Sequence, residues 1–187
     1  FSAGIGKIDS NNLEKNNPKI NDLIVRLGGP AFKIGLGGGY GSSINNNGSQ
    51  FEKNAVQRGD PQMGNKLNRV IRYLCSLDNN PIITIHDQGA GGLGNVVKEI
   101  VYPFGGSVEL SNVTCGDLSI TPLEIWCSEF QESDVIVIKP TDIDLVKQIC
   151  LVENIYCDIL GKIKNTGYIE VKYDNNTILS LPLEPII

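Results

Sequence analysis

Residues 82–93 combine the residue types in this sequence that are most able to do chemistry. Asp87 follows a continuous apolar run at residues 82–85, and three glycines follow Asp87 at close spacing. Such a run is typical of a central strand buried on both faces, so Asp87 would lie at the carboxyl edge of a sheet, where α/β proteins bind ligands. The glycines let the backbone approach a ligand closely, and the next helix would point its N-terminus there, which favours anions.

A carboxylate beside a bound phosphate is what Mg²⁺ requires, so the pattern indicates a magnesium site at Asp87. The alternative interpretation makes Asp87 a helix cap and the glycines plain turn residues. His86 is the only histidine, and it is expected to point away from Asp87 because successive strand residues face opposite ways. A structural role is therefore favoured for His86 over a role as general base.

Two other segments are candidates for ligand binding. Residues 35–43 are rich in glycine like a phosphate-binding loop, but no Gly-Lys-Ser/Thr sequence closes them. Close backbone packing followed by a mobile loop is an equally good interpretation. A second cluster surrounds Trp126, where carboxylates and an amide are contributed by Glu124 and residues 129–132. These groups could hold a small polar substrate, although such a cluster is more often a solvated surface.

The composition excludes several classes of protein. The chain has 187 residues and a net charge of -5, so it lacks the basic field that binding of a nucleic-acid backbone requires. Its longest apolar runs fall far short of the ~20 residues of a membrane span. Five cysteines without a CxxC pair indicate buried thiols of a reduced, cytoplasmic protein, not a disulfide framework or a metal site. The opening has no Met and no secretory signal, which we interpret as a piece of a longer protein.

The order of apolar patterns predicts strands alternating with helices, hence an α/β or α+β fold. Strands are expected at residues 22–27, 32–36, 82–85, 107–110, 135–138, 156–163, 168–172 and 177–181, the last two as a hairpin. Helices are expected from Pro61 to Asp78, over 93–101, over 121–126 and over 141–154, with Asp60 and Thr141 as caps. Residues 1–20 are interpreted as a connecting segment, and residues 41–55 as a mobile loop.

Four motifs occur in an order that resembles one enzyme family. They are LGGPA at residues 27–31 with IGLGGG at 34–39, VQRGDP at 56–61, IHDQGAGG at 85–92, and LEIW at 123–126 with EFQES at 129–133. Together they resemble the first AIR-synthetase-like C-domain of the phosphoribosylformylglycinamidine synthase (FGAM synthase) family, in its large single-chain form. The resemblance covers nearly the whole chain, because residues 4–8 also fit the stretch that precedes that domain.

The resemblance implies a layered fold like the C-terminal domain of AIR synthetase, a mixed β-sheet with packed helices. Residues 1–20 would connect from a preceding ATP-binding domain, and residues 21–187 would form the C-domain. The implied enzyme is an ATP-dependent glutamine amidotransferase, a carbon–nitrogen ligase of purine biosynthesis. It turns formylglycinamide ribonucleotide, ATP and glutamine into formylglycinamidine ribonucleotide, ADP, phosphate and glutamate.

The resemblance also implies roles for particular residues. Gln57 matches a substrate-binding glutamine, Asp87 matches a Mg²⁺-binding aspartate, and Glu129, Phe130 and Gln131 match a substrate-binding Glu-Ser-Gln stretch. Phe130 replaces the serine, so a backbone contact survives the change but a hydroxyl contact does not. The family's catalytic histidine and its glutaminase residues lie in other domains, so no catalytic residue is assigned here and the chain alone is expected to be inactive.

Partners and alternatives follow from the same resemblance. ATP would be bound mainly by the preceding domain, ammonia would come from a glutaminase domain, and a bared inter-domain face would favour self-association. One alternative is the C-domain of another ATP-dependent enzyme of the AIR synthetase superfamily, against which Gln57 and residues 129–131 count. The other is a non-catalytic scaffold domain, as in the second half of large members; Asp87 and Glu129 favour the catalytic half.

Overall fold

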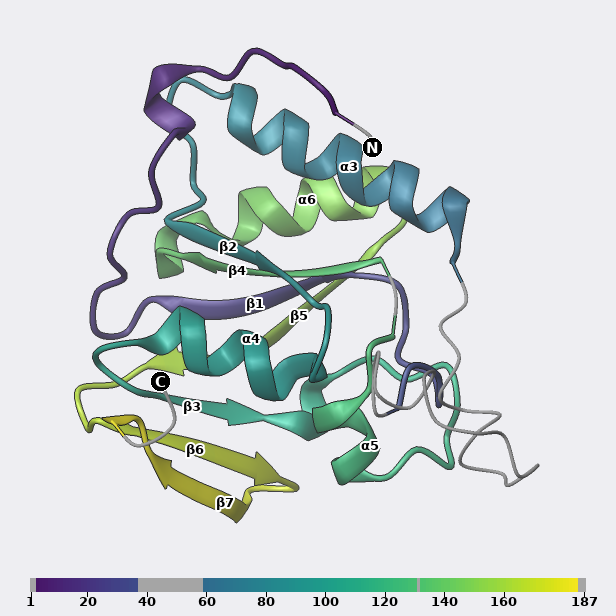
Figure 1. Ribbon diagram of the computed structural model, residues 1–187, viewed down its shortest axis with the longest axis vertical. Helices are drawn as coiled ribbons and strands as arrows, with labels where there is room; N and C mark the ends of the chain where they lie inside the picture. Colours follow the sequence, from purple (N-terminus) through teal and green to yellow (C-terminus); the bar gives the residue numbers. More distant parts are fainter. Residues whose placement is uncertain (1–2, 37–58, 131, 185–187) are drawn as a thin grey trace.

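The fold is built on a seven-stranded sheet with the strand order β2-β4-β1-β5-β3-β6-β7. The computed structural model describes residues 3–36, 59–130 and 132–184 (Figure 1). The strands are β1 (Leu23–Gly28), β2 (Thr84–Asp87), β3 (Gly106–Glu109), β4 (Ser133–Ile138), β5 (Tyr156–Ile163), β6 (Tyr168–Tyr173) and β7 (Asn176–Pro182). Neighbouring strands are antiparallel except β3 and β6, which are parallel, so the sheet is mixed as the resemblance implies.

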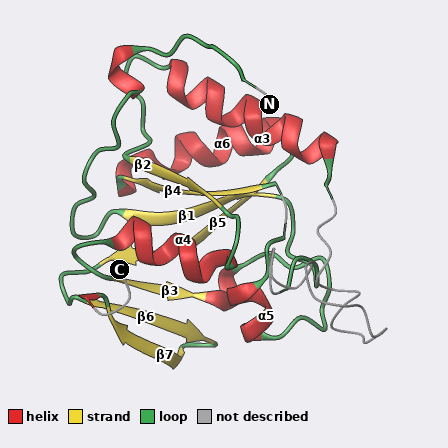
Figure 2. Cartoon of the chain, in the orientation of Figure 1, coloured by secondary structure: helices red, strands yellow, loops and turns green. Residues whose placement is uncertain are grey.

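Helices cover both faces of this sheet (Figure 2). Two of them, α3 (Pro61–Ser76) and α6 (Ile143–Glu153), lie on one face, and α4 (Gly92–Val101) lies on the other with the short α5 (Pro122–Cys127) beside it. Alternate residues of β1 and β4 therefore enter two separate cores: Val25 and Ile136 pack under α3 and α6, whereas Ile24 and Val135 pack with α4. Burial on both faces explains why these strands are continuous apolar runs in the sequence.

The predicted helix that starts at Pro61 is confirmed. The Asp60 carboxylate accepts a hydrogen bond of 3.0 Å from the Met63 amide and caps α3, and Pro61 occupies its first turn. Leu67, Val70 and Leu74 are buried on one face of the helix, as their spacing predicts. The predicted helix over residues 93–101 and the hairpin of β6 and β7 are confirmed as well.

The prediction of a central strand at residues 82–85 is wrong. β2 begins at Thr84, pairs only with β4 and forms one edge of the sheet. Ile82 is buried all the same because the N-terminal segment covers this edge: the Asn16 amide donates to the Ile83 carbonyl over 2.9 Å. The apolar run therefore reflects cover by a distant part of the chain and not pairing on both sides.

Two further local predictions are wrong. Residues 32–36 are not a strand; Ala31 alone forms a bridge with Cys115, and the Ile34 amide turns back to the Phe32 carbonyl. The last helix begins at Ile143, two residues later than predicted, because residues 140–142 form a 3₁₀ turn. The Thr141 hydroxyl bonds to Asp142 in that turn and does not cap the helix.

Some expectations concern properties other than strands and helices. All five cysteines are free thiols. No helix within the described part of the chain has the length and apolar character to cross a bilayer. The predicted mobile loop at residues 41–55 lies outside the described residues, and the predicted connecting segment contains one short 3₁₀ helix, Ser10–Asn12.

The core under α3 gives a first testable prediction. Leu74 is fully buried there, whereas Leu151 of α6 is 78% exposed. Leu74→Ala leaves a cavity, so we expect it to lower the free energy of unfolding by about 2 to 4 kcal/mol in denaturant titrations. The matched change Leu151→Ala should alter it by less than about 0.5 kcal/mol. Equal losses from the two substitutions would contradict this packing.

Candidate functional site

Asp87 lies at the carboxyl end of β2, where its side chain is 83% exposed. Directly opposite, on β4, is Asp134. The next backbone contact continues the pairing: the Gln88 amide donates to the Ser133 carbonyl over 2.9 Å. Asp87 is therefore presented to solvent from a strand end, beside the segment that leads into β4.

Asp134 is the titratable group most perturbed by this arrangement. Burial and, to a smaller extent, the negative charges of Asp87 and Glu132 together raise its pKa from 3.8 to about 6, while His86 acts in the opposite direction. Three carboxylates thus gather where β2 ends and β4 begins. A cation bound there would relieve their mutual repulsion.

His86 is tied to the protein on both ring nitrogens. Nε2 lies 2.8 Å from the Glu99 carboxylate of α4, and Nδ1 lies 2.7 Å from the Asp87 carbonyl oxygen. Both partners are acceptors, so a neutral ring can donate to only one of them at a time. These contacts connect β2 to α4 and agree with the structural role predicted for His86.

The glycines after Asp87 serve the packing of the protein itself. Gly92 has a left-handed φ of +59° at the start of α4. A Cβ there would meet the Ser128 carbonyl oxygen at 2.6 Å, closer than real Cβ contacts. Gly92 therefore lets α4 begin directly against the end of α5.

The predicted substrate segment is packed into the fold on the same side. Glu129 is 3% exposed, and its amide donates to the Gly35 carbonyl over 3.3 Å. Phe130 is 1% exposed, and its ring lies under the Arg26 guanidinium at 4.7 Å from the ring centroid. The Phe130 side chain therefore points into the core, and only its backbone could meet a ligand.

The start of α3 reaches the same place through Glu132. The Glu132 carboxylate accepts a hydrogen bond of 3.3 Å from the Asp60 amide, and Glu132 itself has a left-handed φ of +56°. The structure therefore brings together Asp87, residues 129–130 and 132–134, and the first residues of α3. Gln57 and Gln131 lie outside the described residues, as do Gly37–Gly39.

The sequence analysis included Glu132 in its cluster of polar residues but missed Asp134 and Arg26 as members of this region. A signal existed for Arg26, because a guanidinium inside an apolar strand must find partners. Asp134 gave a weaker signal as a carboxylate at the start of a buried strand. Its pairing with Asp87 depends on strand order, which the sequence does not show.

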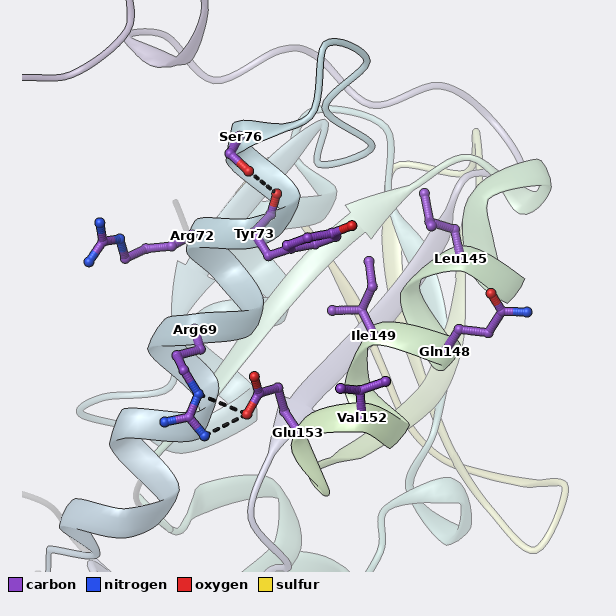
Figure 3. Close-up of a pocket in the computed structure, with 9 residues that line it drawn as sticks. All are labelled: Arg69, Arg72, Tyr73, Ser76, Leu145, Gln148, Ile149, Val152 and Glu153. Atoms are coloured by element: carbon purple, nitrogen blue, oxygen red, sulfur yellow. Dashed lines mark hydrogen bonds and ion pairs between the residues drawn. The ribbon is translucent and has the colours of Figure 1, made fainter.

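A hollow on the other side of the molecule is separate from this region (Figure 3). It has a volume of about 710 Å³ and lies between α3 and α6, with walls that include Tyr73, Ile149 and Val152. Arg69 closes one end by a 2.5 Å contact with Glu153. Of the predicted site residues that the structure describes, Asp87, Glu129 and Phe130, none lines this hollow.

The residues at the end of β2 fit a Mg²⁺ ion that is shared between protein carboxylates and a bound phosphate. They do not fit an ion that protein side chains enclose completely. In the residues covered by the structure, no three His, Cys, Asp or Glu side chains are grouped to hold a metal on their own. Mg²⁺ usually keeps several waters and binds one or two carboxylates together with substrate phosphates. Asp87, with Asp134 beside it, provides such a partial set.

Asp134 gives a pH-dependent prediction. Its pKa is about 6 in the folded chain against 3.8 ordinarily, so its stabilising proton is fully present below about pH 4 and is lost as the pH rises through 6. Asp134→Asn should therefore raise the free energy of unfolding by about 1 to 2 kcal/mol near neutral pH and have little effect near pH 3. The matched control is Asp78→Asn at an exposed position. A gain that is the same at both pH values would rule out this explanation.

Comparison with known proteins places these features in a family. Residues 19–174 match the family described as AIR synthase related protein, C-terminal domain. A probable phosphoribosylformylglycinamidine synthase, chloroplastic/mitochondrial, of Arabidopsis thaliana is 45% identical over 170 residues, which are 89% of this chain and 12% of the relative. The phosphoribosylformylglycinamidine synthases of Dictyostelium discoideum and Homo sapiens are each 40% identical, over 100% and 87% of this chain and 14% and 12% of their own lengths.

Solved structures agree on the fold. The Thermotoga maritima PurL complexed with FGAR superposes with a TM-score of 0.83 at 23% identity, over 92% of this chain and 29% of that one. The same protein complexed with ATP gives 0.79 at 20% identity, over 95% and 27%. The chain spans only about an eighth of the length of its curated relatives. From the matched domain, we conclude that it belongs to the family of AIR synthase related protein, C-terminal domain.

Proposed function

We propose that this chain is one domain of a larger ATP-dependent ligase that converts formylglycinamide ribonucleotide into formylglycinamidine ribonucleotide, with glutamine as the nitrogen donor. Its relatives of 40 to 45% identity carry the name of that synthase, and they are several times longer than this chain. The observation that carries the proposal is the exposure of Asp87 directly beside the packed segment 129–134. The domain would form one wall of a site that neighbouring domains complete.

In this proposal, residues 129–131 and Gln57 bind the ribonucleotide. Glu129 is buried and bonded through its amide to Gly35, and Phe130 is buried too, so these two residues would be positioned before any ligand arrives. Phe130 would contribute its backbone, because its side chain is buried. A segment fixed in advance loses little entropy on binding, and it orients the amide of the substrate for reaction.

Asp87 and Asp134 are the residues that would hold Mg²⁺. When bound, the ion would neutralise the charge of the nucleotide and substrate phosphates. Asp87 is the exposed member of the pair, and Asp134 supports it from the half-buried side of β4. Burial and neighbouring charges raise the pKa of Asp134, and a bound cation would act in the opposite direction by favouring the ionised carboxylate.

The remaining parts of the activity would come from other regions of the parent protein. ATP would bind mainly to a preceding ATP-binding domain, and ammonia would come from a glutaminase domain. The chain alone would then be inactive, and measurable amidine formation by these 187 residues would contradict the proposal. Self-association of the isolated domain and a cytoplasmic location stay predictions.

Asp87→Asn in the full-length protein tests the metal role. The amide lacks the charge that Mg²⁺ prefers, so we expect turnover to fall at least about tenfold and the Mg²⁺ concentration for half-maximal rate to rise. Because Asp87 is exposed, the unfolding temperature should stay within a few degrees of wild type. Asp78→Asn is the matched control, and normal turnover with normal Mg²⁺ dependence in Asp87→Asn would refute the assignment.

Gln57→Ala in the full-length protein tests the substrate role. Removal of the amide should weaken binding of formylglycinamide ribonucleotide by about 1 to 2 kcal/mol. Its KM should then rise roughly five- to thirtyfold, while the KM for ATP stays unchanged. Gln62→Ala, at an exposed position in α3, is the matched control. An unchanged KM for the ribonucleotide would exclude Gln57 as a ligand.

A further inference from the structure

We propose that Arg26 is a positioning residue that orders Phe130, Glu132 and Ser133, in the segment that binds the ribonucleotide under the proposed function. Arg26 lies in the middle of β1, and its side chain is completely buried. No part of the side chain is accessible to solvent, so it cannot contact a ligand itself. Its effect on a ligand would be transmitted through the residues that it holds.

The guanidinium contacts four residues in three parts of the chain. Nη1 donates to Asp158 of β5 over 2.6 Å, and Nη2 donates to the Ser133 hydroxyl of β4 over 2.8 Å. Nη2 also donates to the Gly29 carbonyl oxygen in the turn that follows β1. The guanidinium Cζ atom lies over the ring of Phe130, 4.7 Å from the ring centroid. Ser133 and Phe130 are the two ends of one short stretch, so a single side chain fixes both ends.

The backbone between those ends is held against the same turn. The Gly29 amide donates to the Glu132 carbonyl oxygen over 3.2 Å. Gly28 has a φ of +137°, and a side chain there would collide with that same carbonyl. Because Arg26 binds the Gly29 carbonyl, it also fixes the turn on which Glu132 rests. The left-handed conformation of Glu132 persists only where its surroundings hold it.

The counter-ion Asp158 is held by three donors, and its position helps to orient the guanidinium. Asp158 Oδ2 accepts from Arg26 and from the Thr114 amide, and Oδ1 accepts from the Thr114 hydroxyl over 2.7 Å. A carboxylate with this many donors has one allowed position. The planar, forked guanidinium is then directed toward Ser133 and Gly29 as well.

Stability alone is a poor reason for this arrangement. The desolvation of a buried ion pair often costs as much as the pair returns, and apolar replacements of similar volume are frequently as stable. What apolar side chains cannot supply is a flat cation with donors in fixed directions. The guanidinium lies over Phe130 and donates to Ser133 at the same time, so its role is to order Phe130 and Ser133 relative to each other.

The test is the double variant Arg26→Met with Asp158→Asn in the full-length protein. Arg26→Met alone leaves a buried carboxylate without its partner and should lower the unfolding temperature strongly; the double variant removes both charges and should recover most of that loss. We expect the double variant to keep a KM for formylglycinamide ribonucleotide about tenfold above wild type, with the KM for ATP unchanged. Hydrogen exchange of the amides of residues 129–133 should be faster in it, while exchange in α3 stays at the wild-type rate.

The outcomes separate positioning from a structural role. If the KM for the ribonucleotide and the exchange of residues 129–133 return to wild type together with stability, the proposal is overturned. Arg69→Met, which breaks the exposed pair with Glu153, should change neither quantity. Arg26→Lys provides a second route if the double variant does not fold: it keeps the charge beside Asp158 but lacks the fork and the flat face, so the KM should still rise.

The same experiment distinguishes this inference from the proposed function. A wild-type full-length protein that does not act on formylglycinamide ribonucleotide would overturn the proposed function. The exchange comparison would still decide whether Arg26 orders residues 129–133. Unchanged exchange in both the double variant and Arg26→Lys would overturn the ordering role whatever the activity.

Discussion

A guanidinium buried inside β1 constrains the rest of the domain. Burial lowers the pKa of Arg26, and the charge of Asp158 and its hydrogen bond oppose that effect. Arg26 shares its side of the strand with Ile24, on the face that packs with α4, whereas Leu23, Val25 and Leu27 face α3 and α6. A slip of one residue in the pairing of β1 would place the charge in the core under α3, where the residues are apolar. The arginine thus specifies the register of the central strand.

That register decides what lies at the end of the sheet. Leu27 pairs with Asp134 and Gly28 with Ser133, so β4 enters the sheet with its first residues beside the Gly28–Gly29 turn. β4 in turn fixes the register of β2, in which Asp87 pairs with Asp134. The position of the exposed Asp87 therefore depends on two strand pairings, β1 with β4 and β4 with β2, and the first of these is fixed by the buried Arg26. Two tightly packed cores, one on each face of the sheet, keep these strand ends from shifting.

The sequence was sufficient where local pattern decides the structure. Helices α3 and α4 follow from apolar spacing, and Asp174 and Asn175, both with positive φ, explain why the hairpin of β6 and β7 was predictable. Asp87 was found because its flanking strand and glycines are adjacent in the chain. Arg26 and Asp158 are 132 positions apart, and the cover of β2 by Asn16 is equally non-local, so neither could be read from spacing. Phe130 matched a motif, but the direction of its side chain depends on that same distant arginine.

The position of β1 in the sheet has a consequence for how the molecule is made. β1 precedes the other strands of this sheet along the chain, yet both of its neighbours, β4 and β5, are translated more than a hundred residues later. At ordinary elongation rates this apolar strand waits for several seconds without a pairing partner. An apolar strand with two unpaired edges is prone to aggregation, and in this fold both edges of β1 are covered only once residue 163 has been added.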